Sequence, residues 1–162
     1  MGNLKIINFK CKISFQIYDT DLIVIPSNPT MSAYSEDIGY IYNLMGKNRL
    51  ERFCHNIYDN KRLKVGEIRV TPGFNIKQDI MFMRIPMNES DNSKEELLQT
   101  IKNMITIIEE NEYHEILMLD LNLSIYGYDK EVQKEINELI KNSIQDMDLK
   151  MTYINYNKMT KN

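Results

Sequence analysis

The chain has 162 residues, of which 43% are hydrophobic, enough for one core of ordinary size without support from metals or disulfides. Its 20 basic and 23 acidic side chains give a net charge of -3, and both signs are scattered along the chain, so no footprint for DNA or RNA stands out. No apolar run reaches the roughly 20 residues of a spanning helix, and the first residues do not read as a signal peptide, so we expect a cytoplasmic protein without membrane contact.

The two cysteines, Cys11 and Cys54, are far apart and have no CxxC or Cys/His spacing. We therefore expect reduced, structural thiols and predict neither a metal nor a cofactor. His55 follows Cys54, but neighbours on a helix point in different directions, so the pair does not indicate catalysis.

Strands and helices alternate from the start of the chain. Leu4 to Phe9 predicts a strand, and Lys12 to Phe15 predicts a second that pairs with it in a hairpin or mixed pair. Leu22 to Ile25 is a continuous apolar run stopped by Pro26, which is typical of a strand buried on both faces. We expect this strand at the centre of a sheet.

The next segment predicts one or two helices from about Asp37, with Gly46 as the break between them. Their apolar positions are Ile41, Leu44, Met45, Leu50, Phe53 and Ile57. Gly66 to Thr71 then predicts a strand, and Ile80 to Ile85 predicts another that ends at Pro86.

A long helix follows, for which Ser93 and Glu96 form a capping-box signature. One face of this helix carries Leu97, Ile101, Met104, Ile105 and Ile108. Ile116 to Leu121 predicts a buried strand, and Asp129 is the expected N-cap of a helix with Val132, Ile136, Leu139 and Ile140 on one face.

Met151 to Tyr156 predicts the closing strand, and about 158–162 form a polar tail. The pattern predicts one domain over residues 1–162, of the α/β class, with helices on both faces of a mixed, largely parallel sheet.

Two segments that follow buried strands are the expected ligand site, because ligands of open α/β sheets bind outside the carboxyl ends of the strands. They run from Ser27 to Gly39 and from Asn122 to Tyr128, and each leads to a helix N-terminus suited to an anion. Gly127 allows close backbone approach of a ligand. The alternative is that this glycine only makes the turn and that the tyrosines beside it pack over the sheet edge.

Self-contained catalytic motifs are absent from the sequence: it has no P-loop, GxGxxG, GxSxG or HExxH. Acidic residues beside the expected anion site, namely Glu36, Asp37 and Asp129, disfavour phosphate binding unless they are countered.

Three segments, in this order, resemble the macro domain family. Asp21 to Asn28 (DLIVIPSN) is similar to a buried strand ending in an asparagine-containing turn, and Val65 to Asn75 (VGEIRVTPGFN) is similar to the family's GEA..T.GY.L stretch. Ser124 to Asp129 (SIYGYD) is similar to the loop before the penultimate helix. The resemblance covers about Leu4 to Asn157 and implies a three-layer α/β/α fold that binds ADP-ribose.

The resemblance also implies the site residues. Asn28 is the candidate catalytic residue, and the expected ligand-binding residues are Ile13, Asn28, Gly39, Ser124, Ile125, Tyr126, Gly127 and Tyr156. This chain departs from the family pattern at Lys12, Ile25, Tyr34 to Glu36, Ser124 and Asp129. Side chains that replace glycines fill space where a phosphate approaches, which argues against the standard mode of ADP-ribose binding.

The sequence thus predicts a divergent module that binds ADP-ribose or a related nucleotide, or an ADP-ribosylated protein, without efficient catalysis. Two alternatives stay open, an ADP-ribosyl hydrolase and a degenerate fold that acts as a protein-interaction scaffold.

Overall fold

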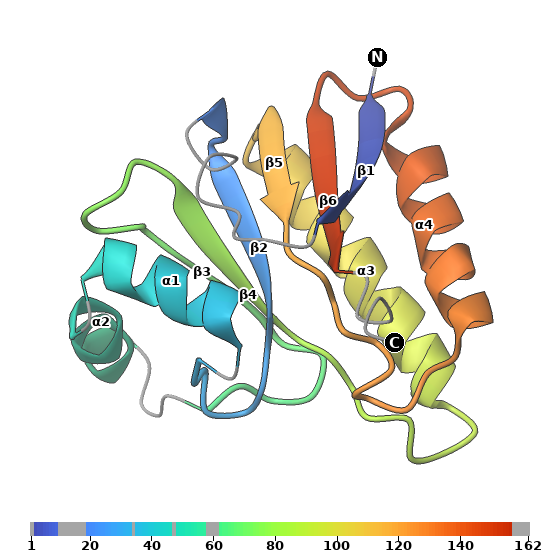
Figure 1. Ribbon diagram of the computed structural model, residues 1–162, viewed down its shortest axis with the longest axis horizontal. Helices are drawn as coiled ribbons and strands as arrows, with labels where there is room; N and C mark the ends of the chain where they lie inside the picture. The colour runs from blue at the N-terminus through green and yellow to red at the C-terminus, as the bar shows by residue number, and fades with distance from the viewer. Residues whose placement is uncertain (1, 10–18, 34, 47, 58–61, 157–162) are drawn as a thin grey trace.

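The computed structural model describes residues 2–9, 19–33, 35–46, 48–57 and 62–156 (Figure 1). This part of the chain holds one six-stranded sheet in the order β1-β6-β5-β2-β4-β3. The strands are β1 (Asn3–Phe9), β2 (Leu22–Ser27), β3 (Ile68–Thr71), β4 (Asp79–Arg84), β5 (Glu115–Met118) and β6 (Lys150–Tyr156). All neighbouring strands are parallel except β3, which is antiparallel to β4, so the predicted mixed, largely parallel sheet is confirmed.

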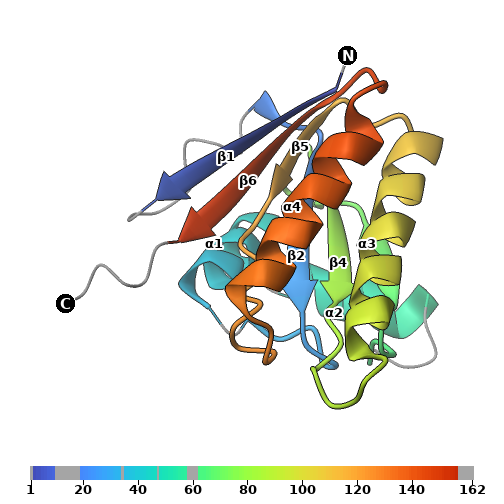
Figure 2. The ribbon, with the colours of Figure 1, turned by 90° about the vertical axis from the view of Figure 1, so that its right-hand side faces the viewer.

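Helices cover both faces of the sheet. They are α1 (Glu36–Met45), α2 (Arg49–Ile57), α3 (Ser93–Glu110) and α4 (Lys130–Ile144). Figure 2 shows α3 and α4 side by side on one face, with α1 and α2 on the other. The predicted three-layer architecture is therefore confirmed.

The central strand β2 supplies both cores because successive side chains of a strand point to opposite faces. Leu22 and Val24 pack in the cluster with α3 and α4, whereas Ile23 and Ile25 pack in the cluster with α1 and α2. All four are fully buried, which explains why the sequence shows a continuous apolar run here and not an alternating one.

The prediction that Pro26 stops this strand is wrong, because β2 continues to Ser27. The carbonyl of Val24 accepts from the Leu119 amide at 3.0 Å, so the backbone of Val24 faces β5 and that of Pro26, two residues on, faces the same side. The β2–β5 ladder has already ended at Val24 and Met118. The missing N–H of Pro26 therefore costs no ladder hydrogen bond.

The helix boundaries follow the sequence except at α3. Gly46 ends α1 with a φ of 100°, as predicted, and the Asp129 side chain caps α4 by accepting from the Val132 amide at 3.1 Å. The capping box at Ser93 is wrong: Asn92 is the N-cap and makes no side-chain cap hydrogen bond. The buried Ser93 hydroxyl instead accepts from the Glu89 and Ser90 amides, both at 3.0 Å.

The predicted buried faces of α3 and α4 are confirmed, except that Leu139 is only partly buried. The strand expected over Ile116 to Leu121 is shorter, since β5 ends at Met118, although the three residues after it are also buried. The strand expected at Lys12 to Phe15 and the tail at 158–162 lie outside the described residues, and the single domain over 1–162 stays a prediction. No helix in the described part of the chain is long and apolar enough to cross a membrane.

Candidate functional site

Three segments meet where β2, β4 and β5 end, because these strands are parallel to one another. β2 leads through residues 28–35, here called the first loop, into α1, and β5 leads through residues 119–129, the second loop, into α4. Residues 85–92 connect β4 to α3. The N-termini of three helices therefore face the same edge of the sheet (Figure 1).

The first loop is shaped by Asn28, whose amide bonds within the loop. Its Oδ1 accepts from the Ser32 backbone amide at 3.0 Å and from the Thr30 hydroxyl at 3.4 Å. Its Nδ2 donates to the Ser32 hydroxyl at 2.6 Å. Both ends of the Asn28 amide are therefore used to hold the turn.

Contacts with α1 hold the second half of the first loop. Met31 is buried with a φ of 58°, and its carbonyl accepts from the Tyr42 hydroxyl. Ser35 then caps α1 by accepting from the Ile38 amide at 3.3 Å. Glu36 and Asp37 occupy the first turn of α1, where the helix dipole stabilises negative charge.

The second loop is tied to residues 85–93. The Asn88 amide donates to the Tyr126 carbonyl, and the Asn88 Nδ2 donates to the Gly127 carbonyl, both at 2.9 Å. Tyr128 is buried and its hydroxyl donates to the Pro86 carbonyl at 2.8 Å. Tyr126 is also buried, and both tyrosines pack in the core cluster with α3 and α4.

A pocket of about 90 Å³ lies between the two loops. Its lining combines the end of β2, the start of α1 and the first residues of the second loop: Pro26, Ser35, Asp37, Ile38, Leu119, Asp120 and Asn122. Ligand pockets usually measure about 300–1,000 Å³, so this one accommodates a group the size of a ribose or a phosphate rather than a whole nucleotide. A nucleotide would need the loops to separate or would lie partly outside the pocket.

Asp120 connects this pocket to a buried hydrogen-bond network. It is 8% exposed, and its Oδ1 accepts from the Asn122 amide at 2.9 Å and from the Tyr153 hydroxyl at 3.4 Å. The Tyr153 hydroxyl also accepts from the Leu121 amide at 3.1 Å. Burial, reinforced by the charge of Asp120, raises the pKa of Tyr153, so this phenol stays protonated at neutral pH.

The expected site residues that the structure describes lie at the same edge of the sheet, but none of them lines this pocket. Ser124, Ile125 and Gly127 are exposed on the second loop, and Gly39 lies in the second turn of α1. Tyr156 ends β6 opposite Phe9 of β1, and Ile13 lies outside the described residues.

The residues that line the pocket were not among the expected ligand-binding residues. Ser35, Asp37 and Asn122 do lie in the two segments in which a ligand site was expected, although none of them was named as a ligand contact. Asp120 was missed because the strand was predicted to extend to Leu121.

A larger cavity of about 410 Å³ opens between the first loop and α2. Its lining includes Thr30 to Ala33 of the first loop, Tyr42, and Leu50 and Cys54 of α2. The first loop thus borders both cavities. Among the described residues, no group of three His, Cys, Asp or Glu side chains could hold a metal ion.

The open sheet with helices on both faces defines a three-layer α/β/α domain, and its pocket lies at the carboxyl ends of the strands, where ligands of such sheets bind. The macro domain family model matches residues 27–137, and the chain belongs to this family. No curated protein matches the chain.

Solved structures share the fold at low sequence identity. The Oceanobacillus iheyensis macrodomain with ADP superposes with a TM-score of 0.75 at 21% identity, covering 94% of this chain and 82% of that one. The macro domain of ganglioside induced differentiation associated protein 2 gives 0.74 at 16% identity, covering 93% and 77%. The Trypanosoma brucei macrodomain in complex with ADP-ribose gives 0.66 at 18% identity, covering 83% and 58%.

Proposed function

We propose that this chain binds ADP-ribose or a related nucleotide, free or attached to a protein, and does not turn it over efficiently. The observation that carries the proposal is the pocket between the first and second loops, at the carboxyl ends of β2 and β5 and beside the N-terminus of α1. A helix N-terminus at such an edge favours a phosphate, and the polar lining favours ribose hydroxyls. Macrodomains of the same fold have been solved with ADP and with ADP-ribose.

The proposed ligand contacts come from both loops. Ser124 and Ile125 are exposed at the surface of the second loop, and Gly127 adopts a φ of 91° there. Gly39 is bordered by open space: a Cβ added to it would meet nothing nearer than the Ala33 Cβ at 4.0 Å. The protein itself therefore does not require a glycine at position 39, which supports a role for Gly39 in leaving room for a ligand.

Charge makes this site differ from a simple phosphate site. Asp37 and Asp120 both line the pocket, so a phosphate placed there meets two carboxylates as well as the helix dipole. Carboxylates accept hydrogen bonds from ribose hydroxyls, and the pocket has about the volume of such a ring. We therefore propose that the ribose occupies the pocket and that the phosphates lie nearer the exposed second loop.

The geometry of Asn28 supports binding rather than hydrolysis. The Asn28 Oδ1 already accepts two hydrogen bonds within the loop, from Thr30 and Ser32, so both of its lone pairs are used and it cannot accept from an attacking water in this arrangement. We assign no hydrolytic step to it.

Thermal shift and calorimetry with ADP-ribose, ADP, AMP and NAD test the proposal. Ligand that binds only the folded protein raises its Tm by an amount set by the ratio of ligand concentration to Kd. Ile125→Glu adds a negative charge to the second loop and should abolish the shift. Ile6→Glu is the matched control, because Ile6 is also exposed, 43% against 54%, and lies on the edge strand β1, outside the pocket lining.

No shift of the wild-type protein with any of the four nucleotides would contradict the proposal and would favour the scaffold alternative. Equal losses in Ile125→Glu and Ile6→Glu would also contradict it, because binding would then not depend on the second loop.

A further inference from the structure

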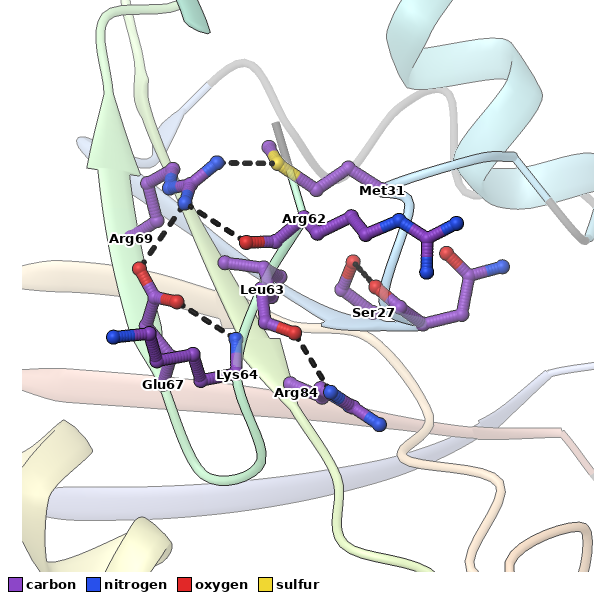
Figure 3. A network of polar contacts seen from close by, with 9 residues as sticks. Ser27, Met31, Arg62, Leu63, Lys64, Glu67, Arg69 and Arg84 are labelled. Carbon is purple, nitrogen blue, oxygen red and sulfur yellow. Dashed lines mark hydrogen bonds and ion pairs between the residues drawn. The ribbon is translucent and has the colours of Figure 1, made fainter. Parts of the chain in front are cut away.

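The strap, defined as residues 62–67, runs between α2 and β3 and lies against the first loop (Figure 3). Arg84 of β4 holds it by donating from Nη1 to the Leu63 carbonyl at 2.7 Å and from its backbone amide to the Glu67 carbonyl at 3.0 Å. Within the strap, Glu67 Oε1 accepts from the Lys64 amide at 2.8 Å. These contacts fix the strap to the edge of the sheet.

Arg69 of β3 joins the strap to the first loop with one guanidinium group. Its side chain is buried, and its Nη1 lies 3.3 Å from the sulfur of Met31. Its Nη2 lies 3.1 Å from Glu67 Oε2 and 3.4 Å from the carbonyl of Arg62. Figure 3 shows the guanidinium between Met31 on one side and the strap on the other.

A second contact links the strap and the first loop directly, since the Leu63 amide donates to the Pro29 carbonyl at 2.7 Å. The strap and Arg69 therefore hold the first loop at Pro29 and Met31. The side-chain hydrogen bonds of Asn28 hold the same loop from within. Met31 has a φ of 58°, a conformation that side chains rarely adopt and that persists only when its surroundings impose it.

We propose that Arg69 is a positioning residue for the ligand site: through its direct contact with Met31, it holds Pro29 to Met31 and with them the first loop, which borders the pocket at Ser35. The loop-holding role stands by itself, and its effect on ligand affinity rests on the proposed function. A planar guanidinium reaches the carboxylate, the carbonyl and the thioether at once, whereas a lysine ammonium keeps the charge but not this spread of donors.

Arg69→Lys tests the proposal with the buried charge retained. Hydrogen exchange of the unliganded protein should show the Met31 and Ser32 amides exchanging about tenfold faster, because the loop opens more often, while amides in the buried turns of α3 and α4 change less than about twofold. Arg84→Lys is the matched control, because it loosens the same strap without contact between its side chain and Met31. It should leave Met31 and Ser32 within about twofold of the wild type.

Calorimetry then measures the effect on the site. The Kd for ADP-ribose should rise by about fivefold or more in Arg69→Lys and should stay near the wild-type value in Arg84→Lys, since an unheld loop lowers the population that is competent to bind.

Two results would overturn the role of Arg69. One is unchanged exchange at Met31 and Ser32 in Arg69→Lys, and the other is acceleration of equal size in Arg84→Lys or throughout α3 and α4. An unchanged Kd in Arg69→Lys, despite faster loop exchange, would overturn its role in the ligand site. Absence of ADP-ribose binding to the wild type contradicts the proposed function alone, because the exchange comparison decides the loop-holding role without a ligand.

Discussion

Gly39 and Gly127 differ in what surrounds them. Gly127 has a φ of 91°, and a Cβ added there would lie 3.2 Å from the Cβ of Asn88. Gly39 sits inside α1 with ordinary helical geometry and open space around it. The backbone conformation therefore favours glycine at position 127, whereas at position 39 only the space beside the helix distinguishes glycine from a larger residue.

Alanine substitutions should separate these reasons. Gly127→Ala should lower the free energy of unfolding by about 1–2 kcal/mol because a side chain strains this backbone conformation. Gly39→Ala should raise it by as much as about 1 kcal/mol because alanine favours the helix. Urea unfolding followed by circular dichroism measures both, and losses of equal size would refute the distinction. If Gly39 leaves room for the ligand, Gly39→Val should weaken ADP-ribose binding while the protein stays folded.

Asp37 lines the pocket in which the ribose is proposed to lie. Asp37→Asn should therefore weaken ADP-ribose binding by about three- to tenfold, because a hydrogen bond from a hydroxyl to a charged carboxylate is about twice as strong as one to a neutral amide oxygen. Calorimetry measures the Kd, and Glu138→Gln, which removes the same charge from an exposed position on α4, should change the affinity little. Tighter binding in Asp37→Asn would contradict the placement of the ribose, because it would indicate that the Asp37 charge lies beside phosphates.

At the scale of elements, the N-termini of α3 and α4 are capped differently, although an Asn or Asp residue occupies the N-cap position of both helices. Asp129 caps α4 through its own side chain, whereas Asn92 at the corresponding position of α3 makes no such bond. The nearby Ser93 hydroxyl is turned toward the preceding loop, where it holds the amides of Glu89 and Ser90.

Substitution of the two caps should reflect this difference. Asp129→Ala should cost about 1 kcal/mol of stability, the usual cost of removing a side-chain N-cap, and Asn92→Ala should cost less than about 0.5 kcal/mol. Chemical denaturation of both variants against the wild type provides the comparison. A larger loss in Asn92→Ala than in Asp129→Ala would contradict the observed capping.

At the scale of the whole molecule, a tyrosine that resists ionisation packs on each side of the sheet. Burial raises the pKa of Tyr153, which packs with α3 and α4, and burial also raises that of Tyr42, on the side of α1 and α2. In the unfolded chain both phenols ionise near pH 10.0. Stability contributed by the neutral phenols is thus fully present below pH 10 and is lost as the pH rises above it, because the unfolded chain releases its protons first.

The free energy of unfolding should therefore fall steeply above pH 10. A phenol that stays protonated only in the folded state contributes a slope of up to about 1.4 kcal/mol per pH unit in this range. In Tyr153→Phe the free energy of unfolding should fall less steeply with pH, by up to that amount. The same substitution also lowers stability at pH 8, because it removes the hydrogen bonds to Asp120 and Leu121. Urea unfolding between pH 8 and 11.5 measures the slope, and parallel curves for the two proteins would contradict the role of Tyr153.

The sequence by itself determined the layers of this protein. Leu22 to Ile25 reveals a strand buried on both faces, and the helical spacing of Leu97, Ile101 and Met104 reveals the buried face of α3, because burial patterns repeat with the period of each element. The three segments that resemble macro domains are also short, continuous stretches of sequence, and they indicated the family. The match to the macro domain family model confirms this assignment.

Only the tertiary structure decided which polar groups meet. Ser93 looked like a helix cap because the sequence shows its neighbour Glu96 but not that the loop would fold back to bring the Glu89 and Ser90 amides to its hydroxyl. Asp37 and Asp120 line one pocket although 83 positions separate them in the sequence, and Arg69 contacts Met31 although 38 positions separate them. Hydrogen bonds and pockets depend on distances of a few ångströms between remote segments, and such distances are set by the packing of all the layers together rather than by the period of any one of them.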